Sequence, residues 1–218
     1  MKTDDIDQYN AWELEYKQKG RLWTQYPVHT MHVSSNDQIL ELGVGNGKNI
    51  QGYLSNLLQP DKLEITVLDI SRSALRLVKT NTNIPQDVFA IQADVCFLPF
   101  TDASYGIIFV VHLLDHLLEK KRELAVAEIQ RILKPGGIIY ITVFGVCDMR
   151  YGKGVLVEEH TFCKGNGIIT HYFTSEELTS LFPSHYQVII QESAWEMRIK
   201  GKIHKREEFI ITVQSLCK

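Results

Sequence analysis

The sequence is poor in cysteine and has no long apolar run. Its four cysteines, Cys96, Cys147, Cys163 and Cys217, lack the Cys-x-x-Cys spacing of zinc and redox sites. They therefore indicate neither a metal site nor the disulfide framework of a small secreted protein. No apolar stretch approaches the roughly 20 residues that a membrane-spanning helix needs. The polar start M-K-T-D-D-I-D is unlike a signal peptide, so we expect a cytoplasmic protein without a membrane partner.

An excess of one charge is also missing. The 23 lysines and arginines nearly balance the 26 aspartates and glutamates, which gives the 218 residues a formal charge of −3. This balance does not favour nucleic acid as a partner, because such proteins usually carry a basic excess. With 44% apolar residues the chain can bury one substantial core, so we expect a single domain over residues 1–218.

The most informative stretch is I-L-E-L-G-V-G-N-G, over residues 39–47. Gly43, Gly45 and Gly47 follow a short apolar run led by Glu41, and a helical period begins at Lys48. This pattern predicts a strand that turns tightly into a helix around a bound ligand, because glycine lets the ligand lie against the main chain. Glycines in such a turn can also be purely structural.

The spacing departs from the dinucleotide fingerprint, since Lys48 stands where the last glycine of G-x-G-x-x-G would be. Glu41 would repel a pyrophosphate and favour a ligand that carries positive charge, such as an ammonium beside a sulfonium. The pattern resembles motif I of the class I S-adenosylmethionine-dependent methyltransferases. That resemblance implies S-adenosylmethionine as the cofactor, held in part by Glu41, Gly43, Gly45 and Gly47.

Two acids follow the next two predicted strands. Asp69 ends the strand over 63–69, about 20 positions after Gly47, and Asp94 closes the strand over 88–95. A carboxylate at the carboxyl end of a second parallel strand can accept hydrogen bonds from both hydroxyls of a ribose. The resemblance implies that Asp69 binds the ribose and Asp94 the exocyclic amine of adenine, although either acid can also cap a turn. It adds three residues to the cofactor site: Ile70, Val95 and Val111.

The second half of the chain supports the same resemblance. The sequence R-I-L-K-P-G-G, over 131–137, closely resembles the signature of the UbiE-like (type 11) methyltransferases. Strands and helices alternate from 38 to 143, as in a doubly wound parallel sheet. The segments 186–192 and 208–216 are further predicted strands, joined by a charged connection that holds Arg198, Lys200, Gly201, Lys202, Lys205 and Arg206.

The resemblance implies an α/β, Rossmann-like sheet of seven strands in the order 3-2-1-4-5-7-6, with strand 7 antiparallel. Within the single domain we expect an aromatic cover segment over 1–36 and an acceptor-side insertion over 149–185. The cover segment carries Tyr9, Trp12, Tyr16, Trp23 and Tyr26, and loosely resembles the cover helix of thiopurine- and tellurite-type methyltransferases. Aromatic faces attract a sulfonium or ammonium cation, but Trp12 and Tyr16 can also simply pack the helix onto the sheet.

A sulfonium methyl is already activated, so a general base is needed only when the acceptor must lose a proton. The candidate bases are His112, His116, His160 and His171, with Tyr172 and Tyr9 as further choices. His112 directly follows the fourth strand, so we expect it at the carboxyl edge of the sheet and take it as the catalytic candidate. We expect Trp23, His171 and Tyr172 to contact the acceptor. Each of these histidines can also be a packing or surface residue.

The sequence is interpreted as a methyltransferase that acts on a small-molecule acceptor, with no metal. Two alternatives stay open. G-N-G-K at 45–48 and H-Y-F-T-S-E-E-L at 171–178 resemble tRNA wobble-uridine methyltransferases, and the basic connection over 198–206 would then follow phosphates. The second alternative is a noncatalytic partner subunit. The intact glycine turn with Asp69 and Asp94 argues against that role.

Overall fold

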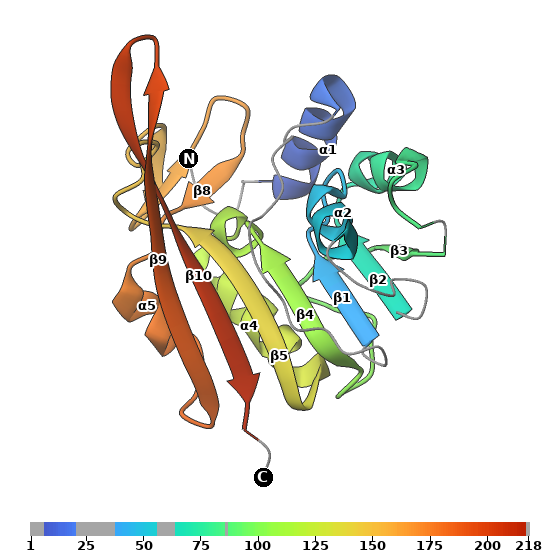
Figure 1. The fold of residues 1–218 in the computed structure, drawn as a ribbon. Helices are drawn as coiled ribbons and strands as arrows, with labels where there is room; N and C mark the ends of the chain where they lie inside the picture. The colour runs from blue at the N-terminus through green and yellow to red at the C-terminus, as the bar shows by residue number, and fades with distance from the viewer. Residues whose placement is uncertain (1–6, 21–37, 56–63, 86, 217–218) are drawn as a thin grey trace.

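A seven-stranded sheet forms the centre of the molecule, in the order β3-β2-β1-β4-β5-β10-β9 (Figure 1). The computed structural model describes residues 7–20, 38–55, 64–85 and 87–216. The strands of the sheet are β1 (Gln38–Leu42), β2 (Glu64–Asp69), β3 (Phe89–Gln92), β4 (Tyr105–Val111), β5 (Leu133–Phe144), β9 (Tyr186–Ile199) and β10 (Lys202–Ser215). Strands β1 to β5 pair in parallel, and β10 pairs antiparallel with both β5 and β9. The predicted fold class and strand order are confirmed, with β9 and β10 as the sixth and seventh strands.

Helices cover both faces of this sheet. They are α1 (Gln8–Lys19), α2 (Lys48–Ser55), α3 (Arg72–Thr80), the short 3₁₀ helix η3 (Leu114–His116), α4 (Glu119–Ile132) and α5 (Ser175–Ser180). The side chains of Ser71 and Thr174 accept the N–H groups of Ala74 and Glu177, which caps α3 and α5. No helix in the described part of the chain is long and apolar enough to span a membrane.

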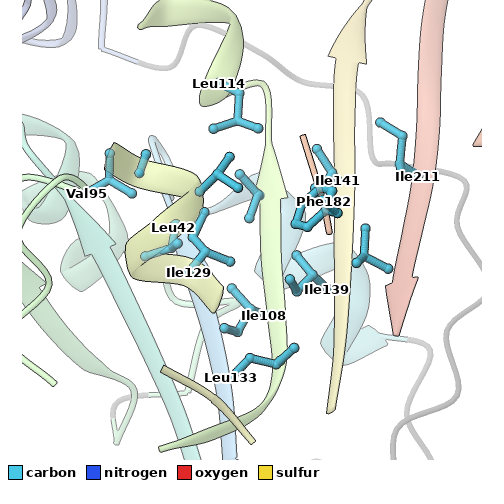
Figure 2. Close-up of a cluster of buried hydrophobic side chains, with 14 of the residues drawn as sticks. Leu42, Val95, Ile108, Leu114, Ile129, Leu133, Ile139, Ile141, Phe182 and Ile211 are labelled. Carbon is cyan, nitrogen blue, oxygen red and sulfur yellow. The ribbon is translucent and has the colours of Figure 1, made fainter. Parts of the chain in front are cut away.

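Two apolar clusters hold the layers together because neighbouring residues on a strand point to opposite faces. On one face, side chains of β1, β4, β5 and β10 pack against α4 and α5, as Figure 2 shows for Leu42, Ile108, Ile129 and Ile139. On the other face, the cluster joins β1, β2 and β4 to Ile50 of α2 and to the apolar residues of α3. A sheet covered on both faces leaves the carboxyl ends of its parallel strands as the natural place for a site.

After residue 149 the structure contains strands that the sequence analysis did not predict. Residues 155–171 form a second, three-stranded sheet of β6 (Val155–Glu158), β7 (Thr161–Cys163) and β8 (Ile169–His171). The segment predicted as a charged connection is instead mostly strand, since β9 and β10 stay paired from Glu208 and Ser193 out to Lys202 and Ile199. Its alternating lysines and arginines hid this pairing, because long charged side chains obscure the period of a strand that has no buried face.

Candidate active site

A cavity of about 350 Å³ lies at the carboxyl ends of the parallel strands. Most of the predicted cofactor residues line it: Gly43, Gly45, Asp69, Ile70, Asp94, Val95 and Val111. They come from the β1–α2 turn and from the ends of β2, β3 and β4. Residues far apart in the chain thus meet at one edge of the sheet, as expected for a doubly wound fold.

The glycine turn has the backbone that its sequence predicts. Gly43, Gly45 and Gly47 have φ angles of +70°, +56° and +77°, in the left-handed region that side chains resist. A Cβ at Gly45 would stand 2.5 Å from Tyr16 Oη, so the main chain lies directly under helix α1. Gly47 has a different role, since a Cβ there would press on Ile84 in the core rather than face the cavity.

Asp69 is buried at the centre of the cofactor side of the cavity. Its carboxylate accepts the N–H groups of Gly45 and Ser71, each at 2.8 Å. Burial raises the pKa of Asp69 to about 6, although these two hydrogen bonds favour the ionised form. The carboxylate therefore both fixes the glycine turn and presents acceptor oxygen to the cavity.

Asp94 is less buried and carries charge more readily. It accepts the N–H of Cys96 at 2.9 Å and pairs with Lys121 Nζ at 3.2 Å. Burial alone would raise the pKa of Asp94, but these partners lower it below its ordinary value. Asp94 is thus ionised at neutral pH where it meets the cavity.

Glu41, predicted to bind the cofactor, is held by Asn49, a residue of the cavity lining. It is fully buried, hydrogen-bonded to Asn49 Nδ2 at 3.2 Å, and does not line the cavity formed by the described residues. Burial raises the pKa of Glu41 to about 8, so the side chain is protonated at neutral pH. A neutral side chain of this kind would not attract a cationic ligand by its charge.

Helix α1 lies over the cavity, where Gln8, Trp12 and Tyr16 line it. Glu13 anchors the helix by accepting hydrogen bonds from Ser71 Oγ at 2.8 Å and Ser73 Oγ at 2.7 Å. On the other side, Gln8 bonds to the backbone of Gly167 and Ile169. The helix therefore bridges α3 and the second sheet above the site. Trp23, a predicted acceptor contact, lies outside the described residues.

His112 also lines the cavity, directly after the carboxyl end of β4. Its Nδ1 lies 3.1 Å from Asp115 Oδ2, its Nε2 lies 3.5 Å from Glu208 Oε1, and its ring stacks on Phe144 with centroids 4.0 Å apart. Burial lowers the pKa of His112, but the two carboxylates outweigh burial and raise it above the ordinary value. Asp115 also accepts the N–H of Phe144 at 2.7 Å, which fixes the imidazole and the ring as a unit.

Beyond Phe144, two arginines border the cavity. Arg150 lies over the Phe144 ring, with Cζ 3.9 Å from the centroid, and Arg206 Cζ lies 5.3 Å from the Trp195 centroid. Buried Asp148 holds both guanidinium groups, through Arg150 Nε at 2.8 Å and Arg206 Nε at 2.6 Å. Burial raises the pKa of Asp148, but the arginines prevail and bring it to about 2. Sequence reasoning missed this cluster, because its members come from three separate segments.

The other candidate residues have structural partners. His116 Nδ1 lies 2.7 Å from the Ile169 carbonyl oxygen, which accepts its hydrogen bond, and burial lowers the pKa of this imidazole to about 4, so it stays neutral. His171 is bonded between Thr161 and Glu177, and Tyr172 is buried against Phe144 and Phe162. Neither His171 nor Tyr172 lines the cavity formed by the described residues, and the same holds for His160 and Tyr9. Among the described residues no group of His, Cys, Asp or Glu has the arrangement of a metal site.

The chain matches known methyltransferases in both sequence and structure. A family model described as a methyltransferase domain matches residues 40–141. A SAM-dependent methyltransferase from Methanosarcina mazei superposes with a TM-score of 0.65 at 23% identity, covering 85% of this chain and 95% of that one. A second SAM-dependent methyltransferase, from Anabaena variabilis, superposes with a TM-score of 0.64 at 17% identity, covering 97% of this chain and 96% of that one.

Curated relatives bear a more specific name. The tRNA N(3)-cytidine methyltransferase METTL2 of Bos taurus is 32% identical over 171 residues, which are 71% of this chain and 45% of the relative. The protein of the same name in Danio rerio is 30% identical over 78% of this chain and 51% of its own length. The chain therefore spans about half the length of the curated relatives it matches.

These names contradict one expectation. The sequence interpretation gave the partner as a small-molecule acceptor and kept nucleic acid only as an alternative, whereas the relatives are named for action on tRNA. That prediction was wrong because the overall charge of a chain does not show how its basic residues are distributed over the surface. The matching domain, the strand order and the cavity at the glycine turn together show that the chain belongs to the class I S-adenosylmethionine-dependent methyltransferases.

Proposed function

We propose that the protein transfers a methyl group from S-adenosylmethionine to N3 of a cytidine in tRNA. The observation that carries this proposal is its identity of 30% or more to several tRNA N(3)-cytidine methyltransferases, over about two thirds to three quarters of the chain. The proposal retains the tRNA alternative drawn from the sequence but exchanges wobble uridine for cytidine.

The cofactor side of the cavity suits S-adenosylmethionine. Gly43 and Gly45 leave main chain open to the ligand, Asp69 offers a buried carboxylate for the ribose hydroxyls, and Asp94 an ionised one for the adenine amine. When bound there, the cofactor supplies an activated methyl group on a cationic sulfur. Retention of both acids supports an active enzyme over a noncatalytic partner subunit.

The other end of the cavity suits cytosine. The N3 atom of cytosine carries a lone pair, so it needs no general base before it is methylated, and the product base is a cation. Glu208 lines this end, and although burial raises the pKa of this carboxylate, His112 and two arginines lower it below its ordinary value. We assign to Glu208 the acceptance of an N–H from the exocyclic amine and the stabilisation of the positive product. His112 then positions Glu208 and Phe144 rather than removing a proton.

A transfer assay tests this proposal directly. The protein is incubated with tritiated S-adenosylmethionine and either bulk tRNA or a panel of small-molecule acceptors, and the tRNA is then digested to nucleosides for mass spectrometry. We expect label in tRNA, found as N3-methylcytidine, and none after substitution Glu208→Ala. Transfer to small molecules alone, or to another base of tRNA, would refute the assignment.

A further inference from the structure

The outer ends of β9 and β10 form a two-stranded ribbon that extends past the main sheet. Strand β5 pairs with β10 from Glu208 to Gln214, whereas β9 continues to pair with β10 as far as Lys202. Figure 1 shows this hairpin projecting from the upper left of the molecule, at the edge where the parallel strands end. The ribbon comprises residues 194–199 and 202–207. It stands beside the mouth of the cavity, since Trp195 and Arg206 at its base line that cavity.

The two faces of the ribbon differ in chemistry. Residues directly opposite each other in an antiparallel pair share a face, and successive pairs alternate between faces. The face that includes Trp195 and Arg206 continues outward with Met197, His204, Ile199 and Lys202. The opposite face presents Ala194, Glu207, Glu196, Lys205, Arg198 and Ile203. We call the face with Trp195 and Arg206 the cavity face. Both acidic residues of the ribbon lie on the opposite face, and none of the six residues of the cavity face is acidic.

The base of the cavity face is held in a fixed position. Asp148 binds Arg206 Nε at 2.6 Å, and the guanidinium carbon lies 5.3 Å from the Trp195 ring centroid. Trp195 is nevertheless 40% exposed, and Met197 and Ile199 are exposed to a similar extent. An aromatic ring next to an arginine, in line with further apolar and basic residues, offers stacking for bases and charge for phosphates.

The net charge of the ribbon also favours a nucleic acid as its partner. Residues 194–207 contain five basic and two acidic residues, giving a formal charge of +3 in a chain whose total is −3. We propose that the cavity face binds the single-stranded RNA that adjoins the nucleotide in the cavity. A neighbouring base stacks on Trp195, and the backbone phosphates lie along Arg206 and Lys202. This inference rests on the proposed function and adds the surface that receives the RNA strand.

Two charge reversals near the tip separate this role from general attraction. Lys202→Glu lies on the cavity face and Arg198→Glu on the opposite face, so both change the net charge equally. Binding of a fluorescein-labelled tRNA is followed by fluorescence anisotropy over a range of salt concentrations. We expect Lys202→Glu to weaken binding about tenfold and to reduce the salt slope by about 1, with a change below about twofold for Arg198→Glu. Trp195→Ala should cost roughly ten- to a hundredfold with little change in slope, since it removes stacking rather than charge.

Wild-type behaviour distinguishes the two proposals. If the unsubstituted protein binds or methylates no tRNA, the proposed function fails and the ribbon has no RNA to receive. If it does both, but the two charge reversals weaken binding equally or not at all, only the ribbon proposal is overturned. The thermal shift produced by S-adenosylhomocysteine should be the same in both charge variants and the parent, because neither substituted residue lines the cavity.

Discussion

Asp69 should make cofactor binding depend on pH. The pKa of its carboxyl group is raised to about 6 by burial, and ribose hydroxyls donate best to the ionised form. Below that pKa each binding event must first remove a proton, so affinity for S-adenosylhomocysteine should fall about tenfold between pH 7 and pH 5. Loss of the charge in Asp69→Asn should cost about 1.5 to 3 kcal/mol, or roughly ten- to a hundredfold in Kd, at pH 7.

Calorimetry at pH 5, 6 and 7 checks this prediction. The parent should lose affinity toward pH 5, whereas Asp69→Asn should bind weakly and almost equally at all three values. Asp94→Asn is the matched control, because the pKa of Asp94 is lowered and its charge does not change over this range. That control should bind more weakly than the parent and keep the parent's pH dependence.

The substitution also affects the fold, so stability must be measured beside affinity. In Asp69→Asn an amide nitrogen replaces one of the oxygens that accept the N–H groups of Gly45 and Ser71. One buried N–H then loses its partner, at a cost of about 1 to 3 kcal/mol in the free energy of unfolding. If the folded variant binds as tightly as the parent, or shows the same pH dependence, Asp69 only fixes the turn and the cofactor placement is wrong.

Three further substitutions probe the turn, the buried acid and the imidazole. Gly45→Val should abolish the S-adenosylhomocysteine thermal shift while the protein remains folded, since φ is +56° and a Cβ would meet Tyr16; normal binding would mean that the turn is not the cradle. Burial raises the pKa of Glu41 from 4.5 to about 8. Between these values the carboxyl group ionises in the unfolded chain but not in the folded one, so the free energy of unfolding falls as pH rises. Glu41→Gln should therefore raise the melting temperature more at pH 8 than at pH 5, and an equal gain at both would contradict the burial argument. Burial lowers the pKa of His112 but its carboxylate partners raise it, so Asp115→Asn should lower the pKa that NMR titration measures for this imidazole. An unchanged titration would show that the contact with Asp115 has no electrostatic role.

Local sequence was sufficient for the cofactor side of the cavity. The positive φ angles at Gly43 and Gly45 need residues without a Cβ, and a strand that ends in an acid places that acid at the sheet edge. These features lie within single strand-turn-helix units, which is why the local pattern alone places Asp69 and Asp94 at the edge of the sheet. The alternation of apolar strands with helices predicted a doubly wound parallel sheet, and the resemblance to class I methyltransferases supplied the strand order.

Glu41 shows what local reasoning leaves open even within such a unit. Its position next to the glycines indicates closeness to the ligand, but not the direction of its side chain. In the folded protein it is fully buried, with its pKa raised to about 8. Direction depends on which face of the strand is covered, and that is a property of the layers packed against it.

The end of the cavity that we propose for the acceptor was decided by tertiary structure alone. His112 was identified from its place after a strand, but Glu208, which lies 3.5 Å from it, belongs to the last strand of the sheet. Asp148 binds Arg206, which lies 58 positions further along the sequence, as well as the nearby Arg150. Such groups meet because an antiparallel strand returns beside β5, and no periodicity in either segment encodes the other. The sequence by itself therefore determined the fold and the glycine turn, whereas the charged and aromatic surface that we propose for the acceptor exists only once distant strands pair.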